Sequence, residues 1–388
     1  MSKLEKLIAE LCPDGVEYKS IREIAEVGTG NSNGNESVDN GLFPFFVRSQ
    51  TIKSKDDYEY DEEAIIIPGE GGIGEIFHYI NGKYALHQRV YRIHFIVEDV
   101  NTKFAYYYMQ AYFKPFILKK AVSATVTSIR KPMIEDFPLP VPPLPVQREI
   151  VRILDNFTEL TAELTAELTA RRKQYEYYRD ELLMQDSKAT VYRLADVCES
   201  IADGDHMPPP KSDSGVPFIT ISNITEYNQI DFSDTMFVPQ SYYDTLAEKR
   251  KPKTGDILYT VVGSYGIPVC VKEDTAFVFQ RHIAILRPKT QIIKSRYMFH
   301  VMQSTNFRLQ ADKAAKGAAQ KTIGLSSLAE MTLPVPDFDK QQRLINILDQ
   351  FNTICTNLNV GLPAEIEARK KQYEYYRDKL LTFQEAKI

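Results

Sequence analysis

The stretch FTELTAELTAELTARRKQYEYYRDEL, which runs from Phe157 to Leu182, decides the fold. It contains two complete copies of the unit TAEL and a preceding partial copy, TEL. Ala, Glu and Leu are strong helix formers, and Thr is only mildly unfavourable in a helix. From Ile150 to Leu182 apolar or aromatic residues recur at alternating intervals of four and three, with Thr161 and Arg171 as polar exceptions. This heptad pattern predicts a coiled-coil-like helix of about 38 residues, or ~57 Å at ~1.5 Å per residue.

The same segment belongs to an internal repeat. KQYEYYRD at Lys173–Asp180 returns at Lys371–Asp378, and LPVPPLPVQREIVRILDNF (Leu139–Phe157) resembles LPVPDFDKQQRLINILDQF (Leu333–Phe351). The first pair is offset by 198 residues and the second by 194, so the second copy contains one extra helical turn. An insertion of four residues is a stutter in a heptad pattern, and the sequence GLP at Gly361–Pro363 predicts a kink there. We expect the two long helices to pack antiparallel through their apolar seams.

The segments between the helices also resemble each other, although more faintly. FPFFVRSQTI (43–52) resembles VPFITISNIT (216–225), AIIIPGEGGIG (64–74) resembles DILYTVVGSYG (256–266), and HQRVYRI (87–93) resembles FQRHIAI (279–285). Short β-rich runs separated by Gly, Asn and Asp turns, followed by aromatic helical stretches, indicate mixed α/β units. We therefore predict an α+β protein with a pseudo-twofold repeat: globular units at 1–140 and 187–335, and helical regions at 141–186 and 336–388.

Composition excludes several classes of protein. The chain has 388 residues, 26% of them charged, and a net charge of −5. No apolar run approaches the ~18 residues of a membrane helix, and the amphipathic start MSKLEKLIAEL is unlike a signal peptide. The four cysteines are far apart without a CxxC spacing, which favours reduced thiols and a cytoplasmic location.

The motifs give no indication of catalysis. The glycine-rich segments GTGNSNG (28–34) and GEGGIG (69–74) lack the Lys-Ser/Thr that completes a phosphate-binding loop, so turns are the simpler interpretation. The chain has no NPPY-like segment of an amino-methyltransferase, and its six histidines show no HExxH spacing. We predict a protein that is not an enzyme and holds neither a metal nor another cofactor of its own.

The distribution of charge indicates a nucleic acid partner despite the acidic total. Residues 101–134 contain six basic and no acidic residues, and residues 275–329 contain nine basic residues against one aspartate. These two blocks occupy equivalent places in the repeat and are interleaved with aromatic residues. A single basic block is usually a solvated face, but two equivalent blocks favour binding to phosphates.

Together, LCPDGVEYKSIREIAEV (11–27), PLPVQREIVRILDNFTELTAELTAEL (143–168), RKQYEYYRDELL (172–183) and RKKQYEYYRDKLLTF (369–383) carry a family resemblance. The chain resembles the specificity subunit of type I restriction–modification systems over essentially its whole length. The resemblance implies two target-recognition domains, each binding one half of an interrupted site in double-stranded DNA. It also implies helical regions that dock two methyltransferase subunits, which recruit motor/nuclease subunits. S-adenosylmethionine would then be bound by the methyltransferase subunits and not by this chain.

The number of TAEL units acquires a physical meaning in this setting. Each unit adds ~6 Å and ~400° of rotation to a helix, so it nearly preserves the phase of the seam. A base pair rises ~3.4 Å, so one unit should change the gap between the half-sites by roughly one or two base pairs. The alternative is a good helix-forming sequence that was duplicated without a role in spacing.

Candidate DNA-contacting residues follow from side-chain chemistry and from the loops that the resemblance places in the major groove. Asn and Gln pair with adenine, Arg with guanine, and Lys or Arg with phosphate; a solvated loop is the alternative for each residue. The base-reading candidates are Asn31, Ser32, Asn33, Arg48, Gln50, Gln88 and Arg89 in the first unit, and His206, Lys211, Asn223, Gln280 and Arg281 in the second. The phosphate candidates are Lys114, Lys119, Lys120, Arg130, Lys131, Arg308, Lys313, Lys316 and Lys321.

The repeated QYEYYRD segment suggests partner docking. Tyr175 and Tyr178 fall on the seam and should be core residues. The candidates for contacts with a methyltransferase subunit are the off-seam residues and their second copies: Tyr177, Arg179, Tyr375 and Arg377. Two other hypotheses stay open, a coiled-coil scaffold without a DNA role and a nuclease with a cryptic metal-dependent site.

Overall fold

The computed structural model describes residues 2–120, 128–184, 189–204, 208–318, 320–356 and 360–386. The chain forms two compact units: unit 1 comprises Met1–Ala162 with Ala368–Ile388, and unit 2 comprises Glu163–Glu367. Helix α5 (Leu144–Met184) is one continuous helix of 41 residues, so its first half belongs to unit 1 and its second half to unit 2. The units thus share the long helices between them, whereas the sequence suggested separate helical regions.

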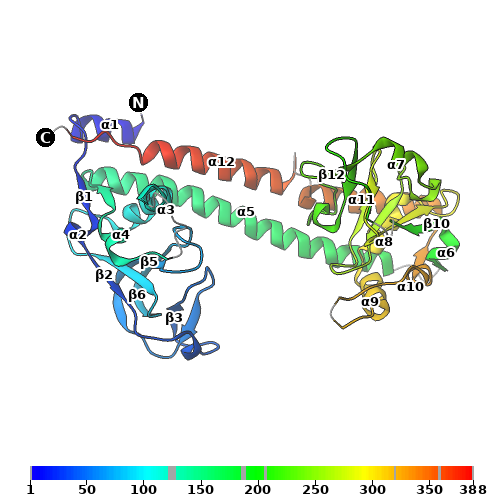
Figure 1. Ribbon diagram of the computed structural model, residues 1–388, viewed down its shortest axis with the longest axis horizontal. Coiled ribbons are helices and arrows are strands. Elements are labelled where there is room, and N and C mark those ends of the chain that lie inside the picture. Colours follow the sequence, from blue (N-terminus) through cyan, green and yellow to red (C-terminus); the bar gives the residue numbers. More distant parts are fainter. Residues whose placement is uncertain are drawn as a thin grey trace. The chain divides into compact units, whose positions relative to one another are not determined.

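Unit 1 is built on a six-stranded sheet that lies below the first half of α5 in Figure 1. Neighbouring strands are antiparallel except β3 and β6, which are parallel. Residues 64–67 in the middle of the sheet are fully buried, as their continuous apolar run predicts. The strand order is β2 (Ala25–Thr29), β7 (Val90–Phe95), β5 (Tyr60–Pro68), β6 (His78–Leu86), β3 (Phe43–Phe46) and β4 (Lys53–Lys55).

The remaining elements of unit 1 surround this sheet. A small antiparallel pair, β1 (Tyr18–Ser20) and β8 (Pro138–Pro140), joins the start of the chain to the hinge before α5. The C-terminal segment pairs with the same region, because Val16 N donates to Gln384 O at 2.8 Å and Ala386 N donates to Val16 O at 3.0 Å. The helices are α1 (Lys3–Leu11), α2 (Ile21–Ile24), the 3-10 turn η1 (Gly34–Glu36), α3 (Thr102–Lys120) and α4 (Lys131–Glu135).

Unit 2 repeats the strand arrangement of unit 1, except that two shorter strands take the place of β6. The counterpart of β6 consists of β14 (Pro268–Cys270) and β15 (Val278–Phe279), which lie in different sheets. One sheet has the order β10 (Cys198–Asp203), β16 (Ile283–Pro288), β13 (Ile257–Thr260), β14, and the other has the order β12 (Met236–Val238), β11 (Val216–Ile219), β15. Strand β9 (Thr190–Arg193) pairs with β17 (Thr332–Val335), as β1 pairs with β8 in unit 1.

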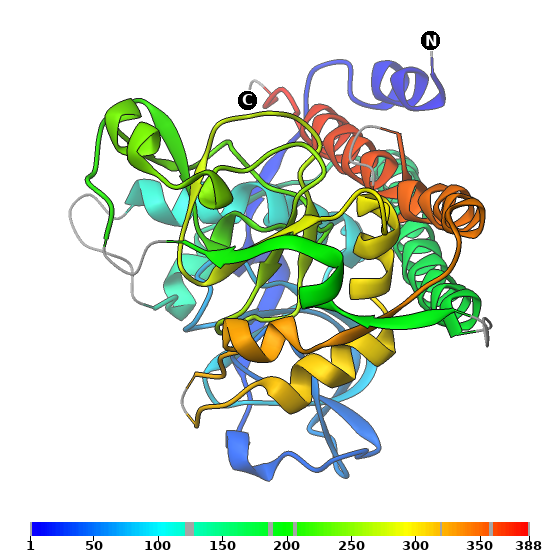
Figure 2. The ribbon, with the colours of Figure 1, turned by 90° about the vertical axis from the view of Figure 1, so that its right-hand side faces the viewer.

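Unit 2 has two helical elements between β12 and β13 that have no counterpart between β4 and β5 of unit 1. Within unit 2, the helices α9 and α10 lie below the strands in Figure 2. The elements are α6 (Leu194–Val197), η2 (Ile221–Asn223), α7 (Gln240–Thr245), η3 (Glu248–Arg250), α8 (Ser295–Met302), α9 (Thr305–Ala314), α10 (Leu325–Ala329) and α11 (Phe338–Thr356).

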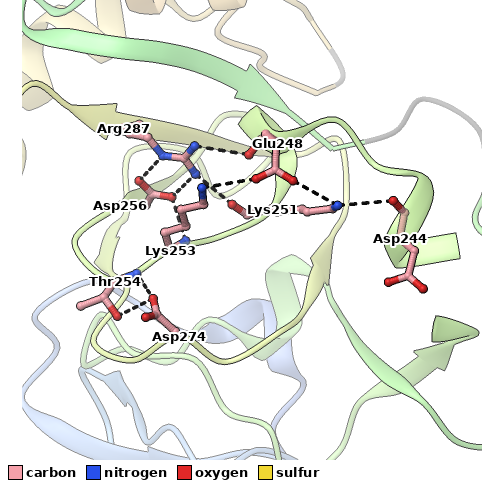
Figure 3. A network of polar contacts seen from close by, with 8 residues as sticks. All are labelled: Asp244, Glu248, Lys251, Lys253, Thr254, Asp256, Asp274 and Arg287. Carbon is pink, nitrogen blue, oxygen red and sulfur yellow. Dashed lines mark hydrogen bonds and ion pairs between the residues drawn. The ribbon is translucent and has the colours of Figure 1, made fainter. Parts of the chain in front are cut away.

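A polar network holds the connection between β12 and β13, which is longer than its counterpart in unit 1 (Figure 3). Arg287 on β16 donates to the buried carboxylate of Asp256 at 2.8 and 3.0 Å and to Lys251 O at 2.9 Å. Lys251 also donates to Glu248 at 3.2 Å and to Asp244 O at 3.3 Å. Charge-assisted hydrogen bonds of this kind fix the connection against the sheet.

The backbone contacts correct one part of the predicted repeat. His87 N donates to Phe46 O at 3.0 Å, and the same contact in unit 2 is made by Gln280 N to Ile219 O at 2.9 Å. His87 therefore corresponds to Gln280, whereas the sequence comparison placed it opposite Phe279. The one-residue shift makes Arg281 the counterpart of Gln88, and His282 the counterpart of Arg89. The sequence comparison had aligned Gln88–Arg89 with Gln280–Arg281 because both are Gln-Arg, and this alignment is one residue out of register.

The predicted apolar seam is largely confirmed. Within unit 1 the second half of α12 (Leu362–Leu380) lies antiparallel to the first half of α5 (Figure 1), and Phe157 stacks on Tyr376. Within unit 2, Phe351 on α11 stacks in the same way on Tyr178. The sequence predicted a kink at Gly361–Pro363, and the structure has two separate helices there, because α11 ends at Thr356 and α12 begins at Leu362.

The predicted seam of α5 is buried in part, since Phe157, Thr161 and Leu164 are half-buried and Arg171 is exposed, and it shifts near the end of the helix. Ile150, Leu154, Leu168 and Tyr175 are buried as predicted. Beyond Tyr175 the buried positions are Arg179 and Leu183 instead of Tyr178 and Leu182.

Two buried glutamines attach the long helices to their units in the same way. The side chain of Gln147 accepts from Asn101 N at 2.8 Å and donates to Asp99 O at 2.7 Å and Pro142 O at 2.6 Å. Its repeat partner Gln341 accepts from Lys294 N at 2.8 Å and donates to Ile292 O at 3.2 Å and Pro336 O at 2.9 Å. Each amide therefore satisfies three backbone groups that have left solvent.

A second equivalent attachment differs in its chemistry. In unit 1, Asp155 accepts from the hydroxyl of Tyr107 at 2.5 Å. In unit 2, the counterpart Asp349 accepts from Nε2 of fully buried His300 at 2.7 Å, while Nδ1 of His300 accepts from the Tyr175 hydroxyl at 2.9 Å. A basic side chain also pairs with each aspartate, Lys103 in unit 1 at 2.8 Å and Arg296 in unit 2 at 2.6 Å.

Acidification is expected to destabilise unit 2 through His300. Burial lowers the pKa of this imidazole, so at pH values between the lowered pKa of the folded unit and about 6.5 the unfolded chain takes up a proton that the folded unit does not. The free energy of unfolding should then fall by up to ~1.4 kcal/mol for each pH unit below that value and be fully retained above it. Thermal unfolding at pH 7.5 and 5.5 measures the effect.

The repeat supplies a matched variant for this test. His300→Tyr introduces the residue that unit 1 carries at the same position, and a phenol does not titrate in this range. Its melting temperature should therefore depend less on pH than that of the wild type. An equal decrease in both proteins between pH 7.5 and 5.5 would exclude His300 as the source.

Candidate nucleic-acid interface

Three loops of unit 1 bring base-reading candidates together at one edge of the sheet. The loop after β2 lies against the turn between β6 and β7, because Gln88 N donates to Ser32 O at 3.0 Å. This approach requires glycine at position 30, since a Cβ atom there would lie 1.7 Å from Leu86 O. The side chains also meet, as Gln88 Nε2 donates to Asn33 Oδ1 at 2.8 Å, and both residues are exposed.

Two arginines from different loops converge on one carboxylate. Arg48 Nη1 donates to Glu70 Oε2 at 2.9 Å, and Arg89 Nη1 donates to both oxygens of Glu70 at 3.0 Å. Hydrogen bonds from Arg89 and then from Arg48 lower the pKa of Glu70. All three side chains stay at least one-third exposed, so this cluster faces solvent.

Glu70 is a site residue that the sequence analysis missed. The available signal was a single acid within the glycine-rich turn GEGGIG. Gly69 N donates to Arg89 O at 2.9 Å, and Ile129 N donates to Gly69 O at 2.8 Å, so this turn lies between the arginine cluster and the basic block.

The other candidates of unit 1 have different surroundings. Ser32 is buried, accepts from Lys55 Nζ at 2.8 Å and donates to Glu59, which corrects the expectation that its hydroxyl is open to a base. Asn31 and Gln50 are exposed.

In unit 2 three candidates line one cavity. Lys211, Gln280 and Arg281 surround a space of about 310 Å³ together with Pro208–Pro210, Phe218 and Met236. The close loop approach recurs here, because a Cβ atom on Gly204 would lie 2.0 Å from Phe279 O. The cavity combines cationic and amide groups with apolar walls, a mixture suited to the edge of a base.

A further candidate of unit 2, Asn223, is not among the described residues that line this cavity. Asn223 is buried, accepts from Thr220 N at 2.9 Å and donates to Asp234 O at 2.9 Å. Its amide therefore stabilises its own loop, which corrects the expectation that it reads a base. His206 lies outside the described residues.

The phosphate candidates differ in how open they are. Lys119, Arg130, Lys313, Lys316 and Lys321 are exposed. Lys316 and Thr322 exchange two backbone hydrogen bonds, at 2.9 and 2.8 Å, so Lys316 and Lys321 lie on one hairpin. The side chain of Lys120 lies outside the described part of the chain.

The other phosphate candidates have acidic partners. Lys114 pairs with Glu75, and Lys131 lies 3.6 Å from Glu135. Arg308 donates to Tyr265 O at 2.7 Å and pairs with Asp312 at 3.3 Å, so much of its guanidinium is already bonded.

The docking candidates on the long helices separate into two groups. Tyr177 and its repeat partner Tyr375 are both 63% exposed, which is unusual for tyrosine and identical in the two units. Arg179 is buried, lies over the ring of Tyr175 and pairs with Asp180, which corrects the expectation that it faces a partner. Arg377 is partly exposed and pairs with Asp378 at 2.8 Å.

No group of three or more His, Cys, Asp or Glu side chains in the described ranges is arranged to hold a metal ion. Among the helices of the described residues, none is both long and apolar enough to cross a membrane.

Comparison with known proteins adds independent information. A family model described as the type I restriction modification DNA specificity domain matches residues 13–171 and 186–368. A putative type I restriction enzyme specificity subunit from Haemophilus influenzae is 29% identical over 402 residues, which cover 98% of each chain. A type I restriction enzyme specificity subunit from Escherichia coli is 31% identical over 260 residues, 63% of each chain.

Solved structures are similar in fold. The type I restriction-modification S subunit from M. genitalium superposes with a TM-score of 0.54 at 15% identity, covering 94% of this chain and 95% of that one. A chain from a structure of the assembly and conformational transition of the type I system gives a TM-score of 0.60 at 15% identity, covering 95% and 98%.

Proposed function

Because the chain belongs to the type I restriction-modification DNA specificity family, we propose that each of its units reads one half of an interrupted DNA site. It is a non-catalytic specificity subunit that acts with DNA and the other subunits of the complex. The observation that supports two separate readers is the repeated approach of a glycine loop to a turn, at Gly30 and Leu86 in unit 1 and at Gly204 and Phe279 in unit 2. Each approach presents exposed amide or basic side chains.

Binding to DNA tests this function against a scaffold without a DNA role and against a hidden nuclease. The chain is purified with its methyltransferase subunits, and its affinity for a duplex that carries the methylated motif is measured at several salt concentrations. Phosphate contacts predict an affinity that falls steeply with salt. Affinity that is absent at every salt concentration would favour the scaffold, and metal-dependent cleavage by the isolated chain would favour the nuclease.

Gly30→Ala is expected to disable the first reader alone. The added Cβ would overlap the backbone carbonyl of Leu86, so the loop that carries Asn31–Asn33 must move. In the methylome of cells that carry the complex, the half-site read by unit 1 should become degenerate or be lost, while binding by unit 2 is retained. Gly34→Ala is the control, because a Cβ there meets only the His87 ring, at 3.8 Å or more. An unchanged motif in the Gly30 variant would contradict the placement of this loop at DNA.

The exposed tyrosines support one methyltransferase docking site in each unit. In this proposal S-adenosylmethionine is bound by the docked subunits and not by this chain. Tyr177→Ala should weaken one site and Tyr375→Ala the other, since large exposed aromatic residues often dominate interfaces. Native mass spectrometry should find one methyltransferase subunit per chain in each single variant and none in the double variant. Two bound subunits in the double variant would show that docking occurs elsewhere.

A further inference from the structure

The amide pair of unit 1 leaves unused hydrogen-bonding groups at its exposed side. With Gln88 Nε2 bonded to Asn33 Oδ1 at 2.8 Å, Gln88 retains its carbonyl oxygen and Asn33 its amino group. Neither group has another partner among the described residues. Exchanging the oxygen and nitrogen of both amides would still leave one donor and one acceptor. Adenine presents the complementary pair in the major groove, the acceptor N7 and the donor N6.

The adjacent arginine cluster has the complementary chemistry for guanine. Glu70 engages Nη1 of Arg48 and of Arg89, and among the described residues no hydrogen bond uses Nη2 or Nε of either arginine. Guanine presents two acceptors in the major groove, O6 and N7, which an arginine binds through two N–H groups. A carboxylate that holds the guanidinium in place reduces the side-chain entropy lost on binding. Two arginines against one glutamate also leave a net positive charge toward DNA.

From these contacts we propose that unit 1 reads an adenine with Asn33 and Gln88 and a neighbouring guanine with Arg89 and Arg48, which Glu70 positions. This assignment rests on the proposed function and names the bases of one half-site. Gln88 and Arg89 are consecutive residues of one exposed turn, so their side chains reach neighbouring base pairs.

Unit 2 carries different residues at the same positions, so the two half-sites differ. Arg281 replaces Gln88, His282 replaces Arg89, and Val262 replaces Glu70 in the register set by the backbone contacts. Unit 2 therefore has no counterpart of the carboxylate that holds two arginines. Its reader presents two cations, Lys211 and Arg281, around one cavity.

The test is the methylome of cells that carry the full complex, with variants at single positions. Gln88→Ala and Asn33→Ala should each make one adenine of the same half-site degenerate. Arg89→Ala should make one guanine of that half-site degenerate. In each variant, the preference for the original base at the affected position should fall roughly 5- to 100-fold. Arg281→Ala is the matched control and should alter only the other half-site.

Glu70→Gln tests the positioning role. The loss of charge should weaken the preference for guanine over other bases at that position. It should leave the preference for adenine and the melting temperature of the protein unchanged. A lower melting temperature with intact guanine discrimination would show that Glu70 is only structural.

Other outcomes separate this assignment from the proposed function. If Gln88→Ala and Arg89→Ala retain the wild-type motif, or relax bases other than an adenine and a guanine, the assignment is wrong while two-unit reading stands. If the wild type directs methylation of no interrupted motif, the proposed function itself fails. Where a variant abolishes methylation, binding of the purified complex is measured by fluorescence anisotropy on duplexes that carry each of the four bases at the assigned adenine or guanine. About equal binding to all four bases supports the assignment, and an undiminished preference for the original base overturns it.

Discussion

Gln341→Leu is expected to destabilise unit 2 by about 3 kcal/mol or more. The substitution keeps the approximate volume of a fully buried side chain but removes its donor and acceptor. Lys294 N, Ile292 O and Pro336 O would then lose partners at 2.8, 3.2 and 2.9 Å. Each buried backbone group left unsatisfied costs about 1–3 kcal/mol. The melting temperature and hydrogen exchange of α8 and α11 measure the effect.

The neighbouring glutamine provides a control with the same chemical change. Gln342 is exposed and bonds with Lys294 Nζ and Asn346, so Gln342→Leu should change the free energy of unfolding by less than about 0.5 kcal/mol. Gln147→Leu should reproduce the effect of Gln341→Leu in unit 1, because its three bonds are equivalent. If Gln341→Leu and Gln342→Leu were equally stable, the buried amide would not be what attaches the helix.

The sequence predicted the repeat, the long helices and an irregularity at Gly361–Pro363 because each depends on local pattern. Heptad spacing, helix propensity and Pro-Gly placement act over a few residues and can be recognised without knowing the neighbours in space. The sequence placed Tyr178 in the seam, but the structure buries Arg179 instead. Local pattern could not predict this difference. It depends on the ring of Tyr175, over which the guanidinium lies, and on its pairing with Asp180.

The candidate site was predicted in part. Loop composition indicated Asn33, Gln88 and Arg89 as base-reading candidates; all three are exposed in the structure, and Gln88 bonds to Asn33. Glu70 was missed because its role comes from two arginines distant in sequence. Asn223 has the same chemistry as Asn33 but is buried, and only the fold distinguishes an amide that caps its own loop from one that is open to a ligand. The one-residue error in the repeat has a similar cause, since the backbone contacts of His87 and Gln280 that reveal the correct alignment are visible only in the structure.

Deleting one TAEL unit, Thr165–Leu168, is expected to alter the recognised DNA without altering the bases that are read. The structure supports this because the repeats satisfy their polar groups locally: the hydroxyl of Thr161 donates to Phe157 O at 2.8 Å, and that of Thr169 to Thr165 O at 2.9 Å. Glu167 in the deleted unit pairs with Arg171 at 3.5 Å, and the deletion leaves another glutamate, Glu163, four residues before Arg171. The helix would shorten by ~6 Å, which corresponds to roughly one or two base pairs.

Long-read methylome sequencing of two strains tests the central claim most directly. One strain carries the wild-type chain with its methyltransferase subunit, and the other carries the chain without Thr165–Leu168. We predict an interrupted motif methylated at adenine in both strains, with identical halves and a gap shorter by one or two base pairs in the deletion strain. Altered halves or an unchanged gap would show that α5 does not set the distance between two independent readers. The absence of any interrupted motif that depends on this chain would contradict the account as a whole.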